Sequence, residues 1–142
     1  MSAETTPKEK WRANYLPAPA SLNLNQACVI VNKALGDYGC YLVGSSLKRR
    51  DYRDVDVRFM SDENYDRMFR NENGWTNPLW SLMCTTISMW LEKQSGLPID
   101  FQIQRMTQAN AQHSMKTGHE RQPLGIFLDY PGERPSDLKA VP

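Results

Sequence analysis

Three acidic residues lie in segments where apolar and polar side chains alternate, and carboxylates in that setting are suited to metal chemistry. Asp54 and Asp56 alternate with valines over residues 54–60, and Asp100 lies in a second alternating run, 99–103. Side chains at positions i and i+2 of a β-strand point to the same face, so we expect Asp54 and Asp56 to lie together. If the two strands are neighbours in a sheet, all three carboxylates converge.

Such a cluster needs a positive charge to hold it together. Two like charges about 5 Å apart repel by about 3 kcal/mol at an effective dielectric constant near 20. Mg²⁺ or Mn²⁺ would reverse that repulsion, because these ions take carboxylate oxygens and substrate phosphates as ligands. We expect Asp54, Asp56 and Asp100 to be metal ligands and catalytic residues. In the alternative interpretation, the acids form the solvated face of a half-buried strand, with Arg58 as the partner of Asp56.

A Gly-Ser turn precedes the first two acids. Gly44, Ser45 and Ser46 follow the apolar run 40–43, which is typical of a buried strand. A turn of this kind offers backbone N–H groups and hydroxyls to a phosphate, and glycine allows the phosphate to approach closely. We therefore expect these three residues to bind the triphosphate of a nucleotide.

The loop between this turn and the acids is basic. It contains Lys48, Arg49, Arg50 and Arg53, with Asp51 as its acid. Either these cations contact phosphate or the acceptor, or they form a solvated turn in which Asp51 is the internal partner. Lys48 and Arg53 are our candidates for nucleotide binding within this loop.

The expected order of helices and strands determines whether these residues can meet. Apolar spacing, caps and glycine or proline stops predict helices over 21–39, 61–70, 77–94 and 106–116, and a short helix or turn over 45–51. Strands are predicted over 40–43, 54–60, 99–103 and 125–130. The expected class is α+β, with a small mixed β-sheet packed against helices. Residues 1–20 are expected to form an irregular arm and 131–142 a tail, around a domain over 21–130.

The long helix expected over 77–94 carries an apolar stripe that should face the core. The stripe comprises Leu79, Leu82, Met83, Ile87, Trp90 and Leu91. The sequence also predicts buried, unpaired thiols at Cys28, Cys40 and Cys84, because each lies in an apolar stretch without a Cys-x-x-Cys pair. His113 and His119 have no ligand partner at a familiar spacing, so we expect them at the surface.

The amino-acid composition limits the number of domains and the class of protein. The chain has 142 residues, 40% of them hydrophobic, which is enough for one domain with a substantial core. Its 17 Lys and Arg against 16 Asp and Glu leave a net charge of +1, which argues against a strongly basic nucleic-acid-binding arm. No apolar run reaches the roughly 18 residues that span a bilayer, and residues 1–10 lack the apolar core of a secretory signal. We expect a cytoplasmic protein without membrane contact.

The motifs resemble those of a known family. Residues 42–46, the Asp-Val-Asp run that begins ten residues after Gly44, and Asp100 between Ile99 and Phe101 are similar to the three-part signature of the DNA polymerase β-like nucleotidyltransferase superfamily. The superfamily core is a helix, a strand, a short helix, a strand, further helix and a third strand. The order expected over 21–116 is similar, and the resemblance therefore implies a nucleotidyltransferase fold.

The resemblance also implies roles for the residues. Gly44 and Ser45 would hold the nucleoside triphosphate, Asp54 and Asp56 would bind the metals, and Asp100 would be a third ligand that helps to activate the attacking hydroxyl. The implied reaction transfers a nucleoside monophosphate from the triphosphate to a hydroxyl acceptor and releases pyrophosphate, with Mg²⁺ or Mn²⁺ as cofactor.

The acceptor and the partners are not implied by these motifs. Members of the superfamily usually add a second domain for the base or the acceptor, and this chain has little room for one. It resembles a minimal member, in which a protein partner or a second copy in a homodimer binds the acceptor. The alternative is a non-catalytic, antitoxin-like module that binds a nucleotide or a protein on the same fold. A nucleic-acid accessory factor that uses loop 48–53 is disfavoured by the near-neutral charge.

Overall fold

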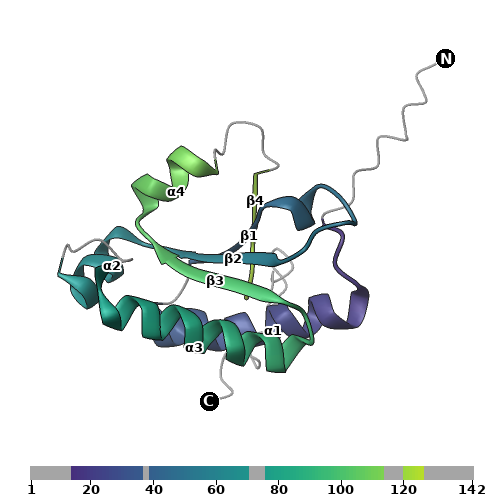
Figure 1. Ribbon diagram of the computed structural model, residues 1–142, viewed down its shortest axis with the longest axis horizontal. Coiled ribbons are helices and arrows are strands. Elements are labelled where there is room, and N and C mark those ends of the chain that lie inside the picture. Colours follow the sequence, from purple (N-terminus) through teal and green to yellow (C-terminus); the bar gives the residue numbers. More distant parts are fainter. Residues whose placement is uncertain (1–13, 37–38, 71–75, 114–119, 127–142) are drawn as a thin grey trace, which may run out of the picture.

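The structure, a computed structural model, describes residues 14–36, 39–70, 76–113 and 120–126 (Figure 1). The strands are β1 (Cys40–Val43), β2 (Val55–Met60), β3 (Ile99–Gln104) and β4 (Arg121–Pro123). The helices are α1 (Ala18–Leu35), the 3-10 helix η2 (Ser45–Leu47), α2 (Asp62–Phe69), α3 (Pro78–Ser95) and α4 (Met106–Gln112). The expected α+β class and the order of elements as far as α4 are confirmed.

The four strands form one mixed sheet in the order β3-β2-β1-β4. Strand β1 is antiparallel to both β2 and β4, whereas β3 is parallel to β2. The register pairs Asp100 with Asp56, Asp56 with Val43, and Val43 with Arg121. Directly paired residues share a face of the sheet, so these four side chains form a row across one face.

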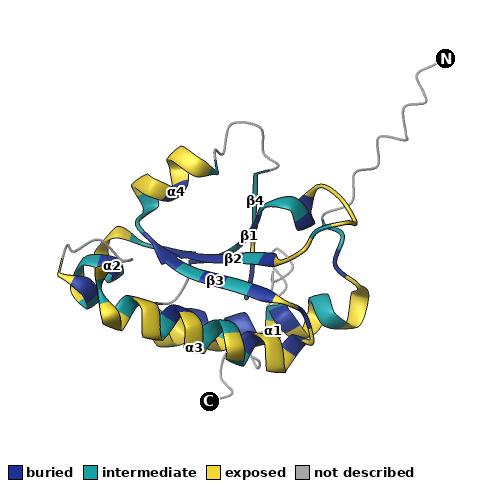
Figure 2. Cartoon of the chain, viewed as in Figure 1, coloured by how far each residue is buried: buried dark blue, intermediate teal, exposed yellow. Residues whose placement is uncertain are grey.

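The other face of the sheet packs against α1 and α3 and forms the main core (Figures 1 and 2). Val55, Val57 and Phe59 of β2 are completely buried there, as the alternation in the sequence predicts. Phe101 and Ile103 of β3 are each only 1% exposed on the same side. Helix α4 lies over part of the opposite face, which carries the row with Asp56 and Asp100 (Figure 1).

Helix α1 begins earlier than the sequence predicts. Its first residue is Ala18, with Pro17 as the N-cap and Pro19 in the first turn. Proline is tolerated there because the first N–H groups of a helix have no partner inside the helix. Leu16 is 4% exposed and belongs to the core, so the predicted irregular arm over 1–20 is wrong over its last residues. Gly36 ends the helix, ahead of the predicted stop at residue 39.

The last strand also differs from the prediction. Strand β4 covers Arg121–Pro123, where it pairs with β1, and the described residues after it, Leu124, Gly125 and Ile126, are not in a strand. Gly125 has φ +76°, which turns the chain away from the extended conformation. Residues 127–130 of the predicted strand and the predicted tail over 131–142 lie outside the described residues, as do residues 114–116 of the helix predicted over 106–116.

The prediction that the apolar stripe on α3 faces the core is wrong for two of its residues. Leu79 is 46% exposed and Leu82 is 64% exposed. The side of the helix that contains them is turned away from the sheet, because α3 packs against α1 and β3 on its other sides. Leu91 is buried, and Met83, Ile87 and Trp90 pack against the core as expected.

The outer backbone edge of β3, which has no neighbouring strand, is covered by α3. Four side chains spaced four residues apart on α3 take part: Trp80, Cys84, Ser88 and Glu92. Trp80 Nε1 donates to the carbonyl of Ile103 over 2.8 Å, and the other three accept from the N–H groups of Ile103, Phe101 and Ile99. The helix thus satisfies a strand edge that would otherwise be open to another chain. No helix among the described residues is long and apolar enough to cross a membrane.

Candidate functional site

The structure brings two of the three predicted acids together. Asp56 on β2 stands directly opposite Asp100 on β3, on the face that α1 and α3 leave free. Their side chains are 26% and 44% exposed, so both carboxylates can be reached from solvent. Asp54 precedes the first residue of β2 and is exposed.

A buried arginine lies between the paired acids. Arg58 Nη2 is 3.8 Å from Asp56 Oδ1 and 3.4 Å from Asp100 Oδ2, and the Arg58 side chain is only 11% exposed. Its Nη1 donates to the backbone carbonyls of Asp100, over 2.7 Å, and Val57, over 3.1 Å. The pairing of Arg58 with Asp56 that the alternative interpretation contains is therefore confirmed, and Arg58 partners Asp100 as well.

The charges around Asp56 act in opposite directions on its pKa. Burial raises the pKa of the Asp56 carboxyl, the Arg58 guanidinium lowers it, and the carboxylates of Asp100 and Asp54 raise it again, with a net rise above the ordinary value. The three acids are therefore close enough to interact electrostatically. A second positive charge near Asp56 would be favourable.

Gly44 packs directly on Asp56. It follows β1, where Val43 pairs with Asp56, and it has φ +82°. A Cβ atom built on Gly44 would collide with Oδ2 of Asp56. Only glycine combines this backbone conformation with this close approach to Asp56.

The two serines of the turn have different environments. Ser45 begins η2 and is partly exposed, whereas Ser46 is completely buried. The hydroxyl of Ser46 has no hydrogen-bond partner among the described residues, and its carbonyl accepts from the N–H of Tyr15 over 2.8 Å. Gly44 and Ser45 are therefore the accessible part of the turn, and a contact between the Ser46 side chain and a nucleotide would require the turn to open.

Two cations of the basic loop form ion pairs, Arg49 within the loop and Lys48 with a residue distant in the sequence. Lys48 Nζ lies 3.2 Å from Oε2 of Glu120, and Arg49 Nε lies 3.0 Å from Oδ1 of Asp51. The role of Asp51 as an internal partner is thereby confirmed for Arg49. Arg53 is exposed next to Asp54. Nucleotide binding by Lys48 and Arg53 stays a prediction.

The fit of a divalent cation depends on the paired acids. Among the described residues, no group of three or more His, Cys, Asp or Glu side chains is arranged to hold a metal ion. Asp56 and Asp100 nevertheless offer the hard oxygen ligands that Mg²⁺ and Mn²⁺ prefer, and Mg²⁺ completes its shell with water and substrate phosphate. In donor chemistry these two residues fit such an ion, and a ligand role for Asp54 stays a prediction.

Arg121 belongs to the same face of the sheet, and the sequence analysis did not single it out. Its Nη2 donates to the carbonyl of His113 and to Oδ1 of Asn110, each over 2.7 Å, and its guanidinium lies 5.5 Å from the centre of the Tyr41 ring. It thus ties α4 to the sheet. His113, which was expected at the surface, is partly buried, and burial with the neighbouring cations Arg58 and Arg121 lowers its pKa. No sequence signal marks this contact, because β4 follows the last predicted helix without a recognisable pattern.

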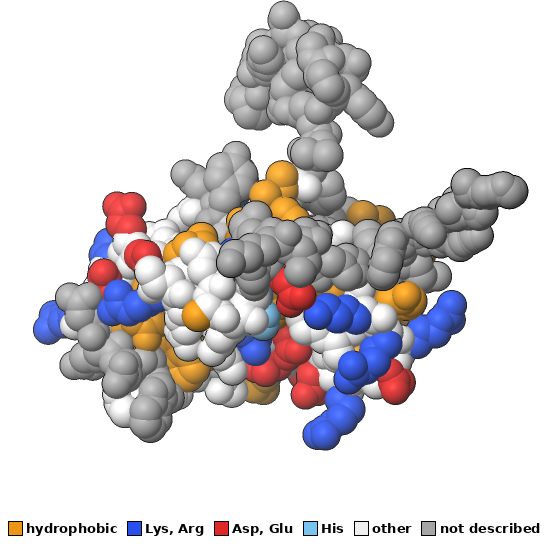
Figure 3. All heavy atoms as spheres, turned by 90° about the horizontal axis from the view of Figure 1, so that it is seen from above, with side chains coloured by type: hydrophobic (Ala, Val, Ile, Leu, Met, Phe, Trp, Pro, Cys, Tyr) orange, Lys and Arg blue, Asp and Glu red, His pale blue; other side chains and the backbone are white. Residues whose placement is uncertain are grey.

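Figure 3 views the molecule from the side of this face, and acidic side chains gather there beside basic ones.

Comparisons with protein-family models, with curated proteins and with solved structures found no match for the chain. The geometry of the paired acids, Arg58 and Gly44 therefore carries the functional argument.

Proposed function

We propose that this protein is a metal-dependent nucleotidyltransferase that moves a nucleoside monophosphate from a nucleoside triphosphate to a hydroxyl acceptor, with release of pyrophosphate. One observation carries the proposal: Asp56 and Asp100 face each other across β2 and β3, and the accessible Gly44 turn packs directly on Asp56. An acid pair next to a glycine turn combines ligands for a divalent cation with backbone that a phosphate can approach. The fold would then be a small nucleotidyltransferase fold.

Each residue has a distinct part in this proposal. Asp56 and Asp100 hold the cation, with Asp54 as an additional ligand from the exposed end of β2. A bound divalent cation would neutralise charge on the phosphates and on the reacting oxygens. Gly44 and Ser45 contact the triphosphate, and the more exposed Asp100 orients the acceptor hydroxyl. Because phosphoryl transfer is catalysed mainly by positioning and charge, the chain needs no nucleophilic side chain.

Arg58 positions the acids in this scheme. It is largely buried and reaches both carboxylates as well as the backbone of Asp100. Without a cation, it offsets the repulsion between the two acids and keeps β2 and β3 in register at that point. We therefore treat Arg58 as a positioning residue.

A second candidate is a non-catalytic nucleotide- or partner-binding module on the same fold. The observation that favours it is the Arg58 side chain itself, which already compensates the acid pair, together with the lack of a three-ligand cluster among the described residues. The nucleotide-binding form of this module makes the same prediction for nucleotide binding as the transferase and the opposite prediction for turnover, whereas the partner-binding form predicts neither.

The test combines binding with transfer. Thermal melting with Mn²⁺ and a nucleoside triphosphate, and transfer of α-phosphate label, should both respond to metal in the wild type. Asp56→Asn and Asp100→Asn should abolish the transfer, whereas Glu63→Gln, an exposed acid on α2, should leave it intact. Stabilisation by nucleotide without transfer to any acceptor would favour the nucleotide-binding module. The absence of any response to metal or nucleotide would refute the transferase and the nucleotide-binding module, and would leave only the partner-binding form.

A further inference from the structure

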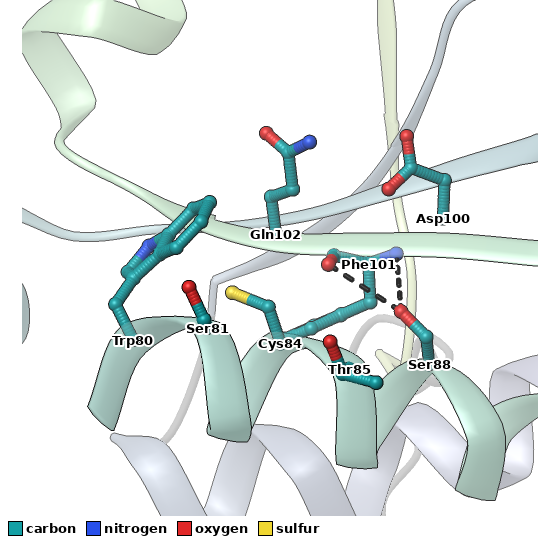
Figure 4. Close-up of a pocket in the computed structure, with 8 residues that line it drawn as sticks. All are labelled: Trp80, Ser81, Cys84, Thr85, Ser88, Asp100, Phe101 and Gln102. Atoms are coloured by element: carbon teal, nitrogen blue, oxygen red, sulfur yellow. Dashed lines mark hydrogen bonds between the residues drawn. The ribbon is translucent and has the colours of Figure 1, made fainter. Parts of the chain in front are cut away.

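A pocket opens beside Asp100, between α3 and the edge strand β3 (Figure 4). Its volume is about 190 Å³. Ser81, Thr85 and Ser88 line it from α3, while Asp100 and Gln102 project from β3. Asp100 thus belongs both to this pocket and to the acid pair, so a ligand in the pocket would lie next to the proposed catalytic site.

Two of the walls are fixed by hydrogen bonds to β3. Trp80 Nε1 donates to the carbonyl of Ile103 over 2.8 Å, and Ser88 Oγ accepts from the N–H of Phe101 over 2.9 Å. These bonds hold the helix and the strand at a set distance. The pocket is therefore formed in advance, which lowers the entropic cost of binding a ligand.

Other polar groups of the pocket are free to bind a ligand. The side chains of Ser81, Thr85 and Gln102 make no hydrogen bonds within the described parts of the chain. Each hydroxyl both donates and accepts, and the amide of Gln102 has two donors and an acceptor oxygen. This combination matches ligand hydroxyl groups, which also donate and accept.

The described lining of the pocket offers no cation that could bind a polyanion. Asp100 is the only charged side chain among the described residues that line it, and no Lys, Arg or His takes part. Nucleic-acid binding depends on contacts between cations and phosphates, and half or more of the hydrogen bonds in such complexes go to the backbone. A nucleic-acid chain would find no cation for its phosphates among the described residues of this pocket.

Size and shape limit the ligand further. A volume of about 190 Å³ is below the roughly 300–1,000 Å³ of pockets that take drug-sized ligands, so there is room for about one ring. Trp80 supplies an aromatic wall, which suits the apolar C–H face of such a ring.

We propose that this pocket binds a neutral polyhydroxylated ring, of the sugar or cyclitol type, with one of its hydroxyls at Asp100. The role of this ring as acceptor depends on the proposed nucleotidyltransferase function, whereas the binding of the ring to the pocket does not. The hydroxyl at Asp100 would attack the α-phosphorus of the nucleoside triphosphate. The new O–P bond would replace the bond to pyrophosphate, and the hydroxyl proton would leave through Asp100 to solvent.

The binding test uses glucose, myo-inositol and a short single-stranded oligonucleotide as probes. The indole N–H resonance of Trp80, assigned with Trp80→Phe, reports on the pocket in ¹H–¹⁵N spectra. At least one of the two polyols should shift this resonance, and the oligonucleotide should not. Thr85→Val should weaken polyol binding about five- to tenfold through the loss of one hydrogen bond. Thr86→Val, an exposed neighbour outside the pocket, should leave binding unchanged.

The transfer test separates this inference from the proposed function. With labelled nucleotide and Mg²⁺, label should appear on the polyol and should fall in Thr85→Val. Label on the oligonucleotide, with Thr85→Val as active as the wild type, would overturn the polyol site and leave the nucleotidyltransferase standing. Polyol binding that depends on Thr85, without transfer to any acceptor, would support the site and refute the transferase. If neither polyol shifts the Trp80 resonance, with or without nucleotide, the polyol site is refuted.

Discussion

Arg58 reaches from β2 to Asp100 on β3, with Nη2 3.4 Å from Oδ2 and Nη1 2.7 Å from the backbone carbonyl of the same residue. The arginine side chain is 11% exposed, whereas that of Asp100 is 44% exposed, so only the arginine end of this ion pair is withdrawn from water. One side chain therefore binds both the carboxylate and the backbone of the neighbouring strand. The acid pair is built around an internal positive charge.

Removal of this charge should destabilise the protein and increase its response to metal. Arg58→Met keeps most of the side-chain length but leaves Asp56 and Asp100 uncompensated. Breaking a buried ion pair on one side costs about 3–5 kcal/mol. The acids here are partly exposed, so we expect a loss of about 2 kcal/mol in the free energy of unfolding, measured with urea.

Mn²⁺ should raise the melting temperature of Arg58→Met more than that of the wild type, because the cation replaces the lost charge. Arg49→Met, which removes the partner of Asp51 in an exposed pair, should change stability by less than about 1 kcal/mol. Equal losses in the two variants would contradict the role assigned to Arg58.

Gly44→Ala should be more damaging than its conformation alone explains. Gly44 and Gly96 have φ values of +82° and +78°, but a Cβ atom at Gly96 would have no neighbour within 4 Å, whereas one at Gly44 would strike Asp56. An alanine at Gly96, where ψ is 9°, carries the strain of the left-handed region, about 1–2 kcal/mol. Gly44 has ψ −158°, in a region that is essentially restricted to glycine. We expect Gly44→Ala to lose about 1–3 kcal/mol more in urea unfolding, through this additional backbone strain and the collision.

Mn²⁺ binding, measured by calorimetry, should weaken only in Gly44→Ala, because the displaced carboxylate belongs to Asp56. Similar unfolding free energies and unchanged Mn²⁺ affinity in both variants would show that Gly44 does not pack on the acid as described.

His113 should make stability depend on pH. Burial, and then the positive charges of Arg58 and Arg121, lower the pKa of His113 below its ordinary value of 6.5. The unfolded chain therefore binds a proton more readily than the folded one, and stability falls as the pH drops from 6.5 through the lowered pKa.

In melting experiments between about pH 7.5 and about pH 5, His113→Asn should lose less stability on acidification than the wild type. The variant keeps the backbone carbonyl that accepts from Arg121, so the contact with β4 is retained. Parallel pH profiles for the two proteins would rule out this contribution.

Cys84 should be unreactive towards alkylating reagents in the folded protein. It is 5% exposed, and burial raises the pKa of its thiol to about 11, so little thiolate is present at neutral pH. We expect mass spectrometry to find the Cys84 peptide unmodified after treatment with iodoacetamide until urea is added. Thr86→Cys, which introduces an exposed thiol on the same helix, should react quickly. Rapid alkylation of Cys84 without denaturant would contradict its burial between α3 and β3.

Much of the local structure could be predicted from the sequence. The alternation in β2 places Val55, Val57 and Phe59 in the core, because the two-residue period of a strand is a property of the backbone itself. Ser61 caps α2 by accepting from the N–H of Asn64, as a helix start of that composition predicts. The expected buried thiols at Cys28, Cys40 and Cys84 are likewise confirmed. Each of these features depends on neighbouring residues or on a simple preference for burial.

The predictions from the sequence were wrong where the packing of distant segments determines the structure. The exposure of Leu79 and Leu82 depends on which side of α3 meets α1 and β3, and an apolar pattern alone does not specify that side when it covers much of the helix. Strand β4 is three residues long, and its strand conformation results from pairing with β1. A segment so short has too few residues to show a period of its own.

The features of the candidate site can likewise be separated into those set by the sequence and those set by the tertiary structure. The sequence by itself determined which residues carry side chains or a turn suited to a cation or a phosphate, and that Asp56 points away from the core. Only the tertiary structure decided that Asp56 meets Asp100, that Arg58 lies between them, and that a polar pocket opens beside Asp100. The physical reason is that side-chain direction follows from local backbone geometry, whereas register and pocket shape follow from how distant segments pack.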